Sequence, residues 1–312
     1  MKKYVILADL TCDLSAELRE YFGVADYIEG SVHFSDGRDF PTTLDWSNIS
    51  REEFYKSLSN KKMQISTAPA SPEMYYEKFK SYAEQGMDIL SMSISSKISS
   101  TYGVATLAAD RVKSEYPDCR IYCFDSYRMS GAFGLLVCYA QQLQNNGSSM
   151  DEVIDWLEAN KNKVHQMGPI DDLMFIARRG RISTGKAIMG TFAGVKPMGD
   201  CNGDGYVSVL GKVKGIKKAL EVTVEYIKRT ATEPENQYII ISHSDREAYA
   251  NMLKEMIEEH IKPKKVFVSD VFSGCGTNVG PGMIGAYFPG DVLSEDGERE
   301  KADMMAAMES VK

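Results

Sequence analysis

The sequence lacks a long apolar run, a cluster of basic residues and any concentration of cysteine. Its longest apolar stretch, near residues 131–140, is well short of the about 20 residues that a membrane-spanning helix needs. Asp9 and Asp13 interrupt the apolar residues 4–8 before a signal-peptide core can form, so we expect a first strand there. The net charge of −8 argues against nucleic-acid binding, which needs clustered Lys and Arg. We therefore expect a cytoplasmic protein without a nucleic-acid partner.

Residues suited to metal binding or catalysis are also few. Of the six cysteines, only Cys119 and Cys123 lie close together, and no second Cys/His pair completes a zinc set, so we predict free thiols. His243 lies beside Ser242 and Ser244, but a G-x-S-x-G element is missing. The other three histidines belong to no recognisable constellation: His33, His165 and His260. We expect no catalytic residue, no metal site and no cofactor.

Short apolar runs alternate with helical periodicity in the first half of the chain. We predict strands over residues 4–8, 89–94 and 120–124, each followed by a helix. Strands that alternate with helices of this length indicate βαβ units and a largely parallel, doubly wound sheet. The helix that follows residue 101 has a predicted apolar face formed by Val104, Leu107, Ala108 and Val112.

The second half of the sequence differs from the first in its composition and in its pattern of predicted strands. Beyond residue 163, Gly and Pro become frequent, and predicted strands over 206–210, 238–241, 266–268 and 283–288 are typical of a mixed sheet. Capping-box spacing predicts helix starts at Ser149 with Glu152 and at Ser244 with Glu247. We place a boundary near residues 160–167, which gives an α/β protein of two domains. These are an N-terminal α/β domain, 1–165, and a C-terminal mixed α/β domain, 166–312.

Hydroxyl-bearing residues follow three of the predicted strands. In an open α/β sheet, ligands collect outside the carboxyl ends of the strands, and helix N-termini there bind anions. Residues 66–72 have the same character and introduce a helix with Ser71 as N-cap and Pro72 in the first turn. Helix capping alone explains each segment, whereas several of them meeting would form an anion site. The residues after the three strands are Thr11, Cys12 and Asp13; Ser95, Ser96, Ser99, Ser100 and Thr101; and Asp125 and Ser126.

Three further segments allow two interpretations each. Residues 273–282 are glycine-rich without the Lys of a phosphate-binding loop, so a tight backbone turn explains them equally well. Residues 200–205 match the front half of a calcium loop, but Gly211 stands at its twelfth position and a β-hairpin turn is the better explanation. The arginines around Gly180, which are Arg178, Arg179 and Arg181, form either a fork for a carboxylate or phosphate or a solvated loop.

Six ordered segments together resemble the DegV family over essentially the whole chain. The family's opening resembles ADLTCDL at 8–14, and its T-S-Q-P-S motif resembles STAPA at 66–70. Its I-S-S-x-L-S-G-T-Y motif is nearly complete in ISSKISSTY at 94–102. The remaining three are similar to DSYRMSGAFG at 125–134, LMFIARRGRIS at 173–183 and NVGPG at 278–282.

This resemblance implies ligand binding and no turnover. Members of the family hold a long-chain fatty acid in a tunnel between two domains, and some present its carboxyl group to a separate ATP-dependent fatty acid kinase. Carried over to this chain, the carboxylate-binding hydroxyls are Thr67, or Ser66, and Ser99, with Arg181 and the loop containing Asn278 close by. The resemblance also allows transient contact with a membrane.

The motifs depart from the family at three positions. Asn278 stands where many members have His, Ala68 replaces Gln, and Ser100 replaces Gly. The fold assignment survives these changes, whereas the kinase partnership is weakened by them. Apolar residues that either line the tunnel or belong to the ordinary core are Phe175, Ile176, Ile188, Met189, Phe192 and Met198.

Two other classes of function stay open at the level of the sequence. One is an enzyme that acts on a small phosphorylated or carboxylated metabolite and uses the hydroxyl-rich turns with Arg178 and Arg181. The other is an interaction or regulatory module in which a lipid is only structural. A carrier predicts a lipid that copurifies and exchanges, an enzyme predicts turnover, and a module predicts a lipid that does not exchange.

Overall fold

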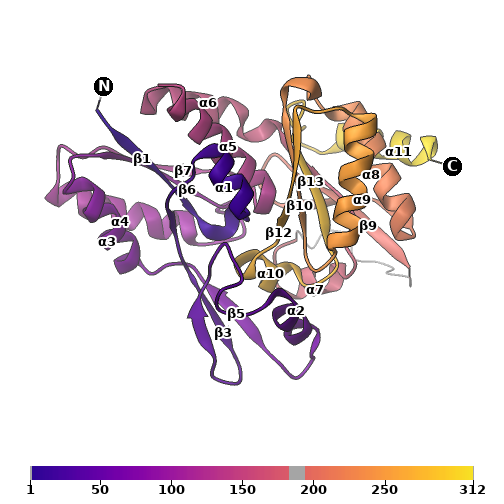
Figure 1. The fold of residues 1–312 in the computed structure, drawn as a ribbon, viewed down its shortest axis with the longest axis horizontal. Coiled ribbons are helices and arrows are strands. Elements are labelled where there is room, and N and C mark those ends of the chain that lie inside the picture. The colour runs from indigo at the N-terminus through magenta and orange to yellow at the C-terminus, as the bar shows by residue number, and fades with distance from the viewer. Residues whose placement is uncertain (1, 183–193, 312) are drawn as a thin grey trace.

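The computed structural model describes residues 2–182 and 194–311, which form two large sheets with a helix between them. The N-terminal sheet lies on the left in Figure 1 and the C-terminal sheet on the right. The chain crosses from one to the other at strand β8 (Val164–Met167), so the predicted boundary at 165/166 falls inside a strand that pairs with the second sheet. The predicted fold class, with one parallel and one mixed sheet, is confirmed.

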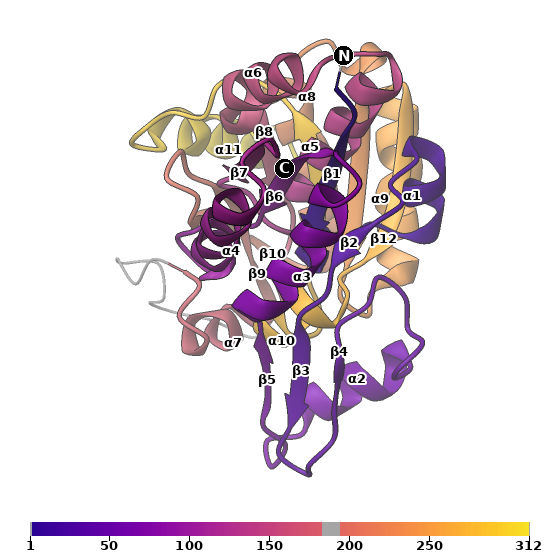
Figure 2. The same ribbon diagram turned by 90° about the vertical axis from the view of Figure 1, so that its left-hand side faces the viewer.

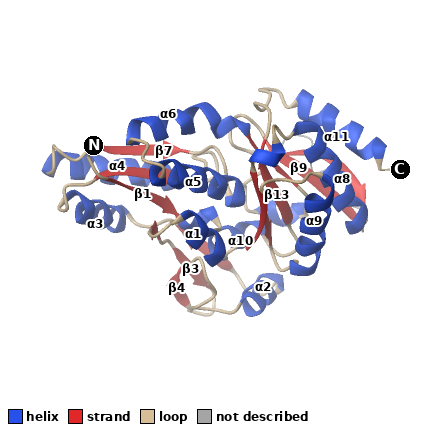
Figure 3. Ribbon diagram, turned by 45° about the horizontal axis from the view of Figure 1, so that its top comes forward, coloured by secondary structure: helices blue, strands red, loops and turns tan. Residues whose placement is uncertain are grey.

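The N-terminal sheet is parallel throughout, in the order β2-β1-β6-β7. Alternate residues of its central strands pack into two separate apolar clusters, one on each face, so the sheet is covered on both sides. This double burial explains the continuous apolar runs in the sequence. The helices that surround the strands are blue in Figure 3. The strands are β1 (Tyr4–Asp9), β2 (Tyr27–Ile28), β6 (Asp88–Ser93) and β7 (Ile121–Asp125).

Helix starts in this domain follow the predicted caps. Ser71 accepts a hydrogen bond from the Met74 amide, and Ser149 and Glu152 form a complete capping box. The predicted apolar face of α4 was wrong in one position, because Leu107 is 67% exposed while Ala105 and Ala109 are buried. The N-terminal helices are α1 (Ala16–Phe22), α2 (Arg51–Ser59), α3 (Pro72–Ala83), α4 (Thr101–Glu115), α5 (Ser130–Asn145) and α6 (Met150–Asn160), with short 3-10 turns η1 (Leu10–Cys12) and η2 (Lys161–Lys163).

A small antiparallel sheet, in the order β4-β3-β5, extends from the N-terminal domain together with α2, as Figure 2 shows. The sequence did not predict it, because its strands are short and the segment ISTA of β5 has no clear apolar alternation. Strand β5 carries two of the predicted binding residues, so this sheet matters for the site. Its strands are β3 (Ser31–Phe34), β4 (Asp39–Pro41) and β5 (Ile65–Ala68).

The C-terminal sheet is mixed, in the order β12-β11-β13-β8, with β13 antiparallel to both of its neighbours. A two-stranded sheet, β9 and β10, continues the domain. The strands are β9 (Val195–Cys201), β10 (Val207–Lys214), β11 (Tyr238–His243), β12 (Lys265–Asp270) and β13 (Ile284–Pro289). The helices are α7 (Leu173–Arg178), α8 (Ile216–Thr230), α9 (Glu247–His260), α10 (Ser273–Val279) and α11 (Glu298–Ser310), with the 3-10 turn η3 (Pro234–Asn236).

One local prediction in this domain was wrong, and one interpretation was correct only in part. Ser244 does not cap α9, since that helix begins at Glu247 without a side-chain cap and the Ser244 hydroxyl accepts a hydrogen bond from the Met283 amide 2.7 Å away. The glycine-rich segment is only partly a turn, because its first seven residues form α10. Gly280 and Gly282 follow that helix with φ of 75° and 97°, and a Cβ on Gly282 would come within 2.4 Å of Asp171.

Helix α5 joins the two halves of the molecule. Its residues 130–138 are all buried, which is expected of a helix with apolar surface on every side. One apolar cluster contains α5 together with Leu90 of the first sheet and Ile240 and Tyr287 of the second. Gly131 and Gly134 permit this close contact, because a Cβ on either would come within 2.3 Å of its neighbour. None of the helices that the structure describes combines the length and apolar character needed to span a bilayer.

Candidate functional site

A cavity of about 350 Å³ lies between the two domains. Its walls come from the turns after β1, β6 and β7, from β5 and α10, and from the inner face of the C-terminal sheet. The volume lies within the about 300–1,000 Å³ that is usual for small-molecule sites. The carboxyl ends of the first sheet therefore open onto this cavity, as expected for an open α/β fold.

Strand alternation decides which hydroxyl of β5 faces the cavity. Thr67 lines it, whereas Ser66 is exposed and is not among the lining residues. Asn278 of α10 donates a hydrogen bond from Nδ2 to Thr67 Oγ1 over 3.3 Å. Because the Thr67 oxygen accepts this bond, its own hydroxyl proton stays available for an acceptor in the cavity.

Ser99 reaches the cavity from the turn before α4. Its hydroxyl lies 2.7 Å from Thr101 Oγ1 and accepts from the Thr101 amide over 3.3 Å. Ser99, Ser100 and Thr101 all line the cavity at the N-terminus of this 15-residue helix. Neutral donors and a helix N-terminus therefore meet the Thr67–Asn278 pair, which suits an anionic oxygen.

Arg181 is the one cation among the described residues that line the cavity. Its guanidinium donates to the Arg179 carbonyl oxygen. Arg178 points elsewhere, is 63% exposed and lies 3.6 Å from Asp172. Burial and the two neighbouring arginines lower the pKa of Arg179. Of the three arginines, Arg181 is the one placed to attract a carboxylate. Ser183, the last residue of that motif, lies outside the described residues.

The apolar part of the wall comes mostly from Ile and Met. Of the residues predicted as tunnel lining, Ile176 lines the cavity, whereas Met198 is fully buried in the C-terminal core and Phe175 packs against Gly280. Ile188, Met189 and Phe192 fall outside the described residues. Other apolar lining residues are Ile28, Ile94, Ile98, Met129, Met167, Ile170, Val279, Met283 and Ile284.

A buried aspartate holds the strand-end turns in place. The Asp9 carboxyl accepts from the Thr11 amide over 2.9 Å and from the Ile94 amide over 2.8 Å, and so connects the turns after β1 and β6. Burial raises the pKa of Asp9, against the opposing effect of these donors. Asp9 therefore fixes the cavity rim, and its side chain is occupied by the protein itself.

The first of two seams between the domains lies at residues 269–272, before α10; we name it the α10 seam. Asp13 accepts from the Phe272 amide over 2.9 Å and from Ser130 Oγ over 2.6 Å. Tyr55 donates to the Val271 carbonyl oxygen over 2.5 Å. Trp46 Nε1 and Arg51 each donate to Asp270, over 2.8 and 2.9 Å. These contacts position α10, and with it Asn278.

The second seam lies at the β9–β10 turn; we name it the hairpin seam. Ser95 Oγ donates to the Gly205 carbonyl oxygen over 3.0 Å, and Arg128 donates to that of Asn202 over 3.3 Å. Gly205 has φ of 89°, and a Cβ there would lie 2.4 Å from Ser95 Oγ. The predicted hairpin turn at 200–205 is confirmed, and it contacts the same loop that carries Ser99.

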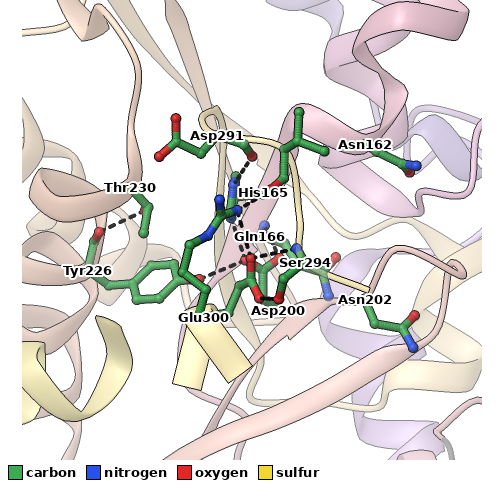
Figure 4. Close-up of polar contacts among 12 residues, drawn as sticks. Asn162, His165, Gln166, Asp200, Asn202, Tyr226, Thr230, Asp291, Ser294 and Glu300 are labelled. Carbon is green, nitrogen blue, oxygen red and sulfur yellow. Dashed lines mark hydrogen bonds and ion pairs between the residues drawn. The ribbon is translucent and has the colours of Figure 1, made fainter. Parts of the chain in front are cut away.

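A buried His–Asp pair fixes the base of this hairpin, as Figure 4 shows. His165 Nδ1 lies 2.7 Å from Asp200 Oδ2, and Nε2 lies 2.8 Å from the Asp291 carbonyl oxygen. Asp200 also accepts from the Gln166 amide over 2.8 Å and from Tyr226 over 3.1 Å. Because both ring nitrogens face acceptors, the imidazolium form fits best. Burial opposes that charge, but the Asp200 carboxylate outweighs burial and raises the pKa of His165.

The same pair bears on the calcium interpretation of residues 200–205. The Asp200 carboxylate is 1% exposed and already binds protein groups. Within residues 2–182 and 194–311, no cluster of three His, Cys, Asp or Glu side chains is arranged to hold a metal ion.

His243 does not form a hydrolytic triad. Its Nδ1 accepts from the Arg246 amide over 3.3 Å, and its Nε2 lies 3.5 Å from Asp270 Oδ1. Burial lowers the pKa of His243, against the opposing effect of Asp270. Ser244 is engaged with the Met283 amide. This histidine belongs to the α10 seam.

The inner face of the C-terminal sheet was missed by the sequence analysis. Gln166, Gly285 and Tyr287 line the cavity from β8 and β13, and Met129 lines it from the turn before α5. No local motif marks Gln166, Gly285 or Tyr287, whereas Met129 lies in the motif at 125–134. Only the pairing of β8 with β13 brings Gln166 opposite Tyr287.

The fold and this site define a class of protein: a two-domain α/β protein with an interdomain cavity lined by apolar side chains and by hydroxyls, an amide and one arginine. The family model described as "Uncharacterised protein, DegV family COG1307" matches residues 3–289. The DegV domain-containing protein CPE0026 of Clostridium perfringens is 32% identical over 291 residues, covering 93% of this chain and 99% of that protein. The chain belongs to the DegV family.

Solved structures share the fold. A Thermotoga maritima protein, TM841, described as revealing a fatty acid binding function, superposes with a TM-score of 0.79 at 25% identity, covering 93% of this chain and 100% of that one. The Fatty Acid Kinase (Fak) B3 protein of Streptococcus pneumoniae, solved with linoleic acid, has a TM-score of 0.78 at 18% identity, covering 93% and 100%. At 18% identity the second likeness shows the fold alone.

Proposed function

We propose that this protein is a carrier that binds one long-chain fatty acid in the interdomain cavity. The observation that carries the proposal is one cavity whose lining combines the polar groups of Thr67, Ser99, Asn278 and Arg181 with a wall of Ile and Met. In this proposal the carboxylate accepts from the Thr67 and Ser99 hydroxyls, while Arg181 supplies the nearest positive charge. Asn278 then takes the place of the family's His as the partner of Thr67.

The energetics favour a carrier over an enzyme for a small metabolite. Each buried methylene contributes about 0.8 kcal/mol, so a long acyl chain contributes on the order of ten kcal/mol before ordering costs are subtracted. A carboxylate held mainly by neutral donors then needs to supply orientation more than affinity. Such a carboxylate also stays available for transfer. We therefore propose a binding role without turnover.

We further propose that the bound fatty acid is presented to a separate ATP-dependent fatty acid kinase. This step rests on the resemblance of the six ordered segments to the family over essentially the whole chain, against the departures at Ser100 and Asn278. The measurement is trapping of an acyl phosphate with hydroxylamine. Hydroxamate is expected only when the carrier, a fatty acid kinase and ATP are all present. Its formation without the carrier would contradict the proposal.

Mass spectrometry of an organic extract of the purified protein tests the carrier function directly. We expect one fatty acid per chain, and exchange of that lipid with added isotope-labelled fatty acid. Repeated preparations that hold no lipid and take up none would contradict the carrier. Turnover of a water-soluble phosphorylated or carboxylated compound would favour the enzyme alternative, and a bound lipid that never exchanges would favour the regulatory module.

The head-group placement is tested by the double substitution Thr67→Ala and Ser99→Ala. Two hydrogen bonds to a charged group are lost, each worth about 1.5–3 kcal/mol, so affinity should fall by about a hundredfold or more while the unfolding midpoint changes little. Ser66→Ala is the matched control, because Ser66 lies on the same strand but faces away from the cavity. Undiminished binding by the double variant would place the carboxylate elsewhere.

A further inference from the structure

Gln166 places a carboxamide in the wall of the cavity. It lies on β8 opposite Tyr287 of β13, so the two side chains share the face of the sheet that packs on α5. Val164, His165 and Met167 around it are buried, whereas Gln166 is partly exposed and lines the cavity. The exposed part of the Gln166 side chain therefore faces the space where a ligand would lie.

The carboxamide of Gln166 has no hydrogen bond to any residue that the structure describes, whereas its backbone amide donates to Asp200. Its surroundings in the cavity wall include Met167, Gly168 and Gly199, whose side chains carry no nitrogen or oxygen atom. An amide has two donor hydrogens and one acceptor oxygen. All of this capacity is left for a ligand or for water.

Gln166 is well separated from the head-group end. Helix α10 with Asn278 leads through residues 280–283 into the start of β13 at Ile284, whereas Gln166 lies opposite Tyr287, three residues further along that strand. Three residues of a strand span roughly 10 Å. A fatty acid whose carboxylate lies at Thr67 and Asn278 would therefore meet Gln166 partway along its chain.

We propose, on the basis of the proposed carrier function, that Gln166 makes the site selective for acyl chains that bear a hydroxyl group partway along their length. An unsubstituted chain covers the carboxamide and leaves its hydrogen bonds unmade, which is costly for a polar group removed from water. A hydroxyl on the chain both donates to the amide oxygen and accepts from the amide nitrogen. Sites built to bind a substrate hydroxyl discriminate strongly against analogues that lack it.

The test compares affinities of the full-length protein for stearic acid and for a panel of 9-, 10- and 12-hydroxystearic acids. At least one hydroxy isomer is expected to bind about tenfold more tightly than stearic acid. In Gln166→Leu and Gln166→Met that preference should disappear, and stearic acid should bind as tightly as to the unaltered protein or more so. Gln64→Leu is the matched control, since it makes the same substitution at an exposed glutamine that does not line the cavity, and it should keep the preference.

Three outcomes would overturn the inference. If stearic acid binds at least as tightly as every isomer, Gln166 confers no selectivity, although the carrier function stands. If both Gln166 variants keep the preference, another group recognises the hydroxyl. If stearic acid binding is itself lost in both variants, the carboxylate lies at Gln166 and the head-group placement is wrong. Failure of every fatty acid to bind the unaltered protein would instead remove the carrier function together with the inference.

Discussion

The two seams beside the cavity each depend on a buried aspartate, but the two carboxyls are accommodated in opposite ways. Asp200, below the hairpin seam, faces a histidine whose pKa it raises. Asp13, in the α10 seam, has only neutral hydrogen-bond donors, and burial raises its pKa to about 8. Burial alone therefore does not decide the charge of a carboxyl; the presence of a cationic partner does.

The exposed parts of the two seams also differ. The hairpin seam ends in neutral hydrogen bonds such as Ser95 to Gly205, within the protein interior. The α10 seam extends outward to Arg51, which is 31% exposed and contacts Glu247 and Asp270. Salt screens exposed pairs far more than buried ones. Added salt should therefore weaken the α10 seam more than the hairpin seam.

The largest effect is expected from Asp200→Asn. The substitution removes the charge that stabilises the buried His165 imidazolium, and breaking one half of a buried pair costs about 3–5 kcal/mol. Urea unfolding at pH 6.5 measures the loss. Tyr226→Phe is the control, because it removes a single hydrogen bond to the same carboxylate, worth about 1 kcal/mol. Equal losses in the two variants would show that Asp200 acts only as a neutral acceptor.

Asp13→Asn should give an intermediate effect that depends on pH. The folded pKa of Asp13, about 8, lies above its ordinary value of 3.8, so the folded state retains a proton that the unfolded state releases. The contribution of Asp13 to stability is then full below about pH 4 and falls as the pH rises towards 8. Asn cannot titrate. Between pH 5.5 and 7.5, the free energy of unfolding of the variant should therefore rise by about 2 kcal/mol relative to that of the unaltered protein.

Unfolding free energies of both proteins across this pH range provide the measurement for Asp13. The titration of His165 is common to the two proteins and cancels in their difference. A difference that stays constant from pH 5.5 to 7.5 would show that Asp13 is ionised in the folded protein, and the contrast between the two seams would fail.

Arg51→Ala should have the smallest effect on stability. Partly exposed ion pairs contribute about 0–1 kcal/mol, and here Trp46 still donates to Asp270 when the arginine is removed. The loss, measured by urea unfolding, should shrink further in 0.5 M NaCl, as a screened interaction does. A loss above about 2 kcal/mol that salt leaves unchanged would mean that the ion pairs of Arg51 are shielded from solvent, and the α10 seam would then not differ from the hairpin seam.

Much of the fold could be predicted from local pattern. The apolar runs at 4–8, 89–94 and 120–124 predicted β1, β6 and β7, and the Ser149–Glu152 pair predicted the start of α6. These features depend on neighbours within a few residues, which the sequence displays directly. Leu107 and Ser244 were assigned wrongly because the side that faces the sheet, and the partner of a hydroxyl, depend on distant segments.

The candidate site also contains residues that could be predicted from the sequence and residues that could not. Thr67, Ser99, Arg181 and Asn278 could be singled out because they lie in motifs, and the structure brings all four to one cavity. Ser66 could not be separated from Thr67, because the strand β5 that turns them to opposite sides was not predicted. Gln166 carries no motif, and it reaches the cavity only through the pairing of β8 with β13.

The sequence by itself determined the α/β class, the alternation of strands and helices around β1, β6 and β7, and the hydroxyl-rich turns, because periodicity and capping act between near neighbours in the chain. Only the tertiary structure decided which turns meet, which of two adjacent hydroxyls faces the cavity, and which buried aspartate has a cationic partner. The physical reason is that hydrogen bonding and desolvation at these positions are set by groups far away in sequence, such as the 256 residues between Asp13 and the Ser269 hydroxyl that donates to its carbonyl oxygen.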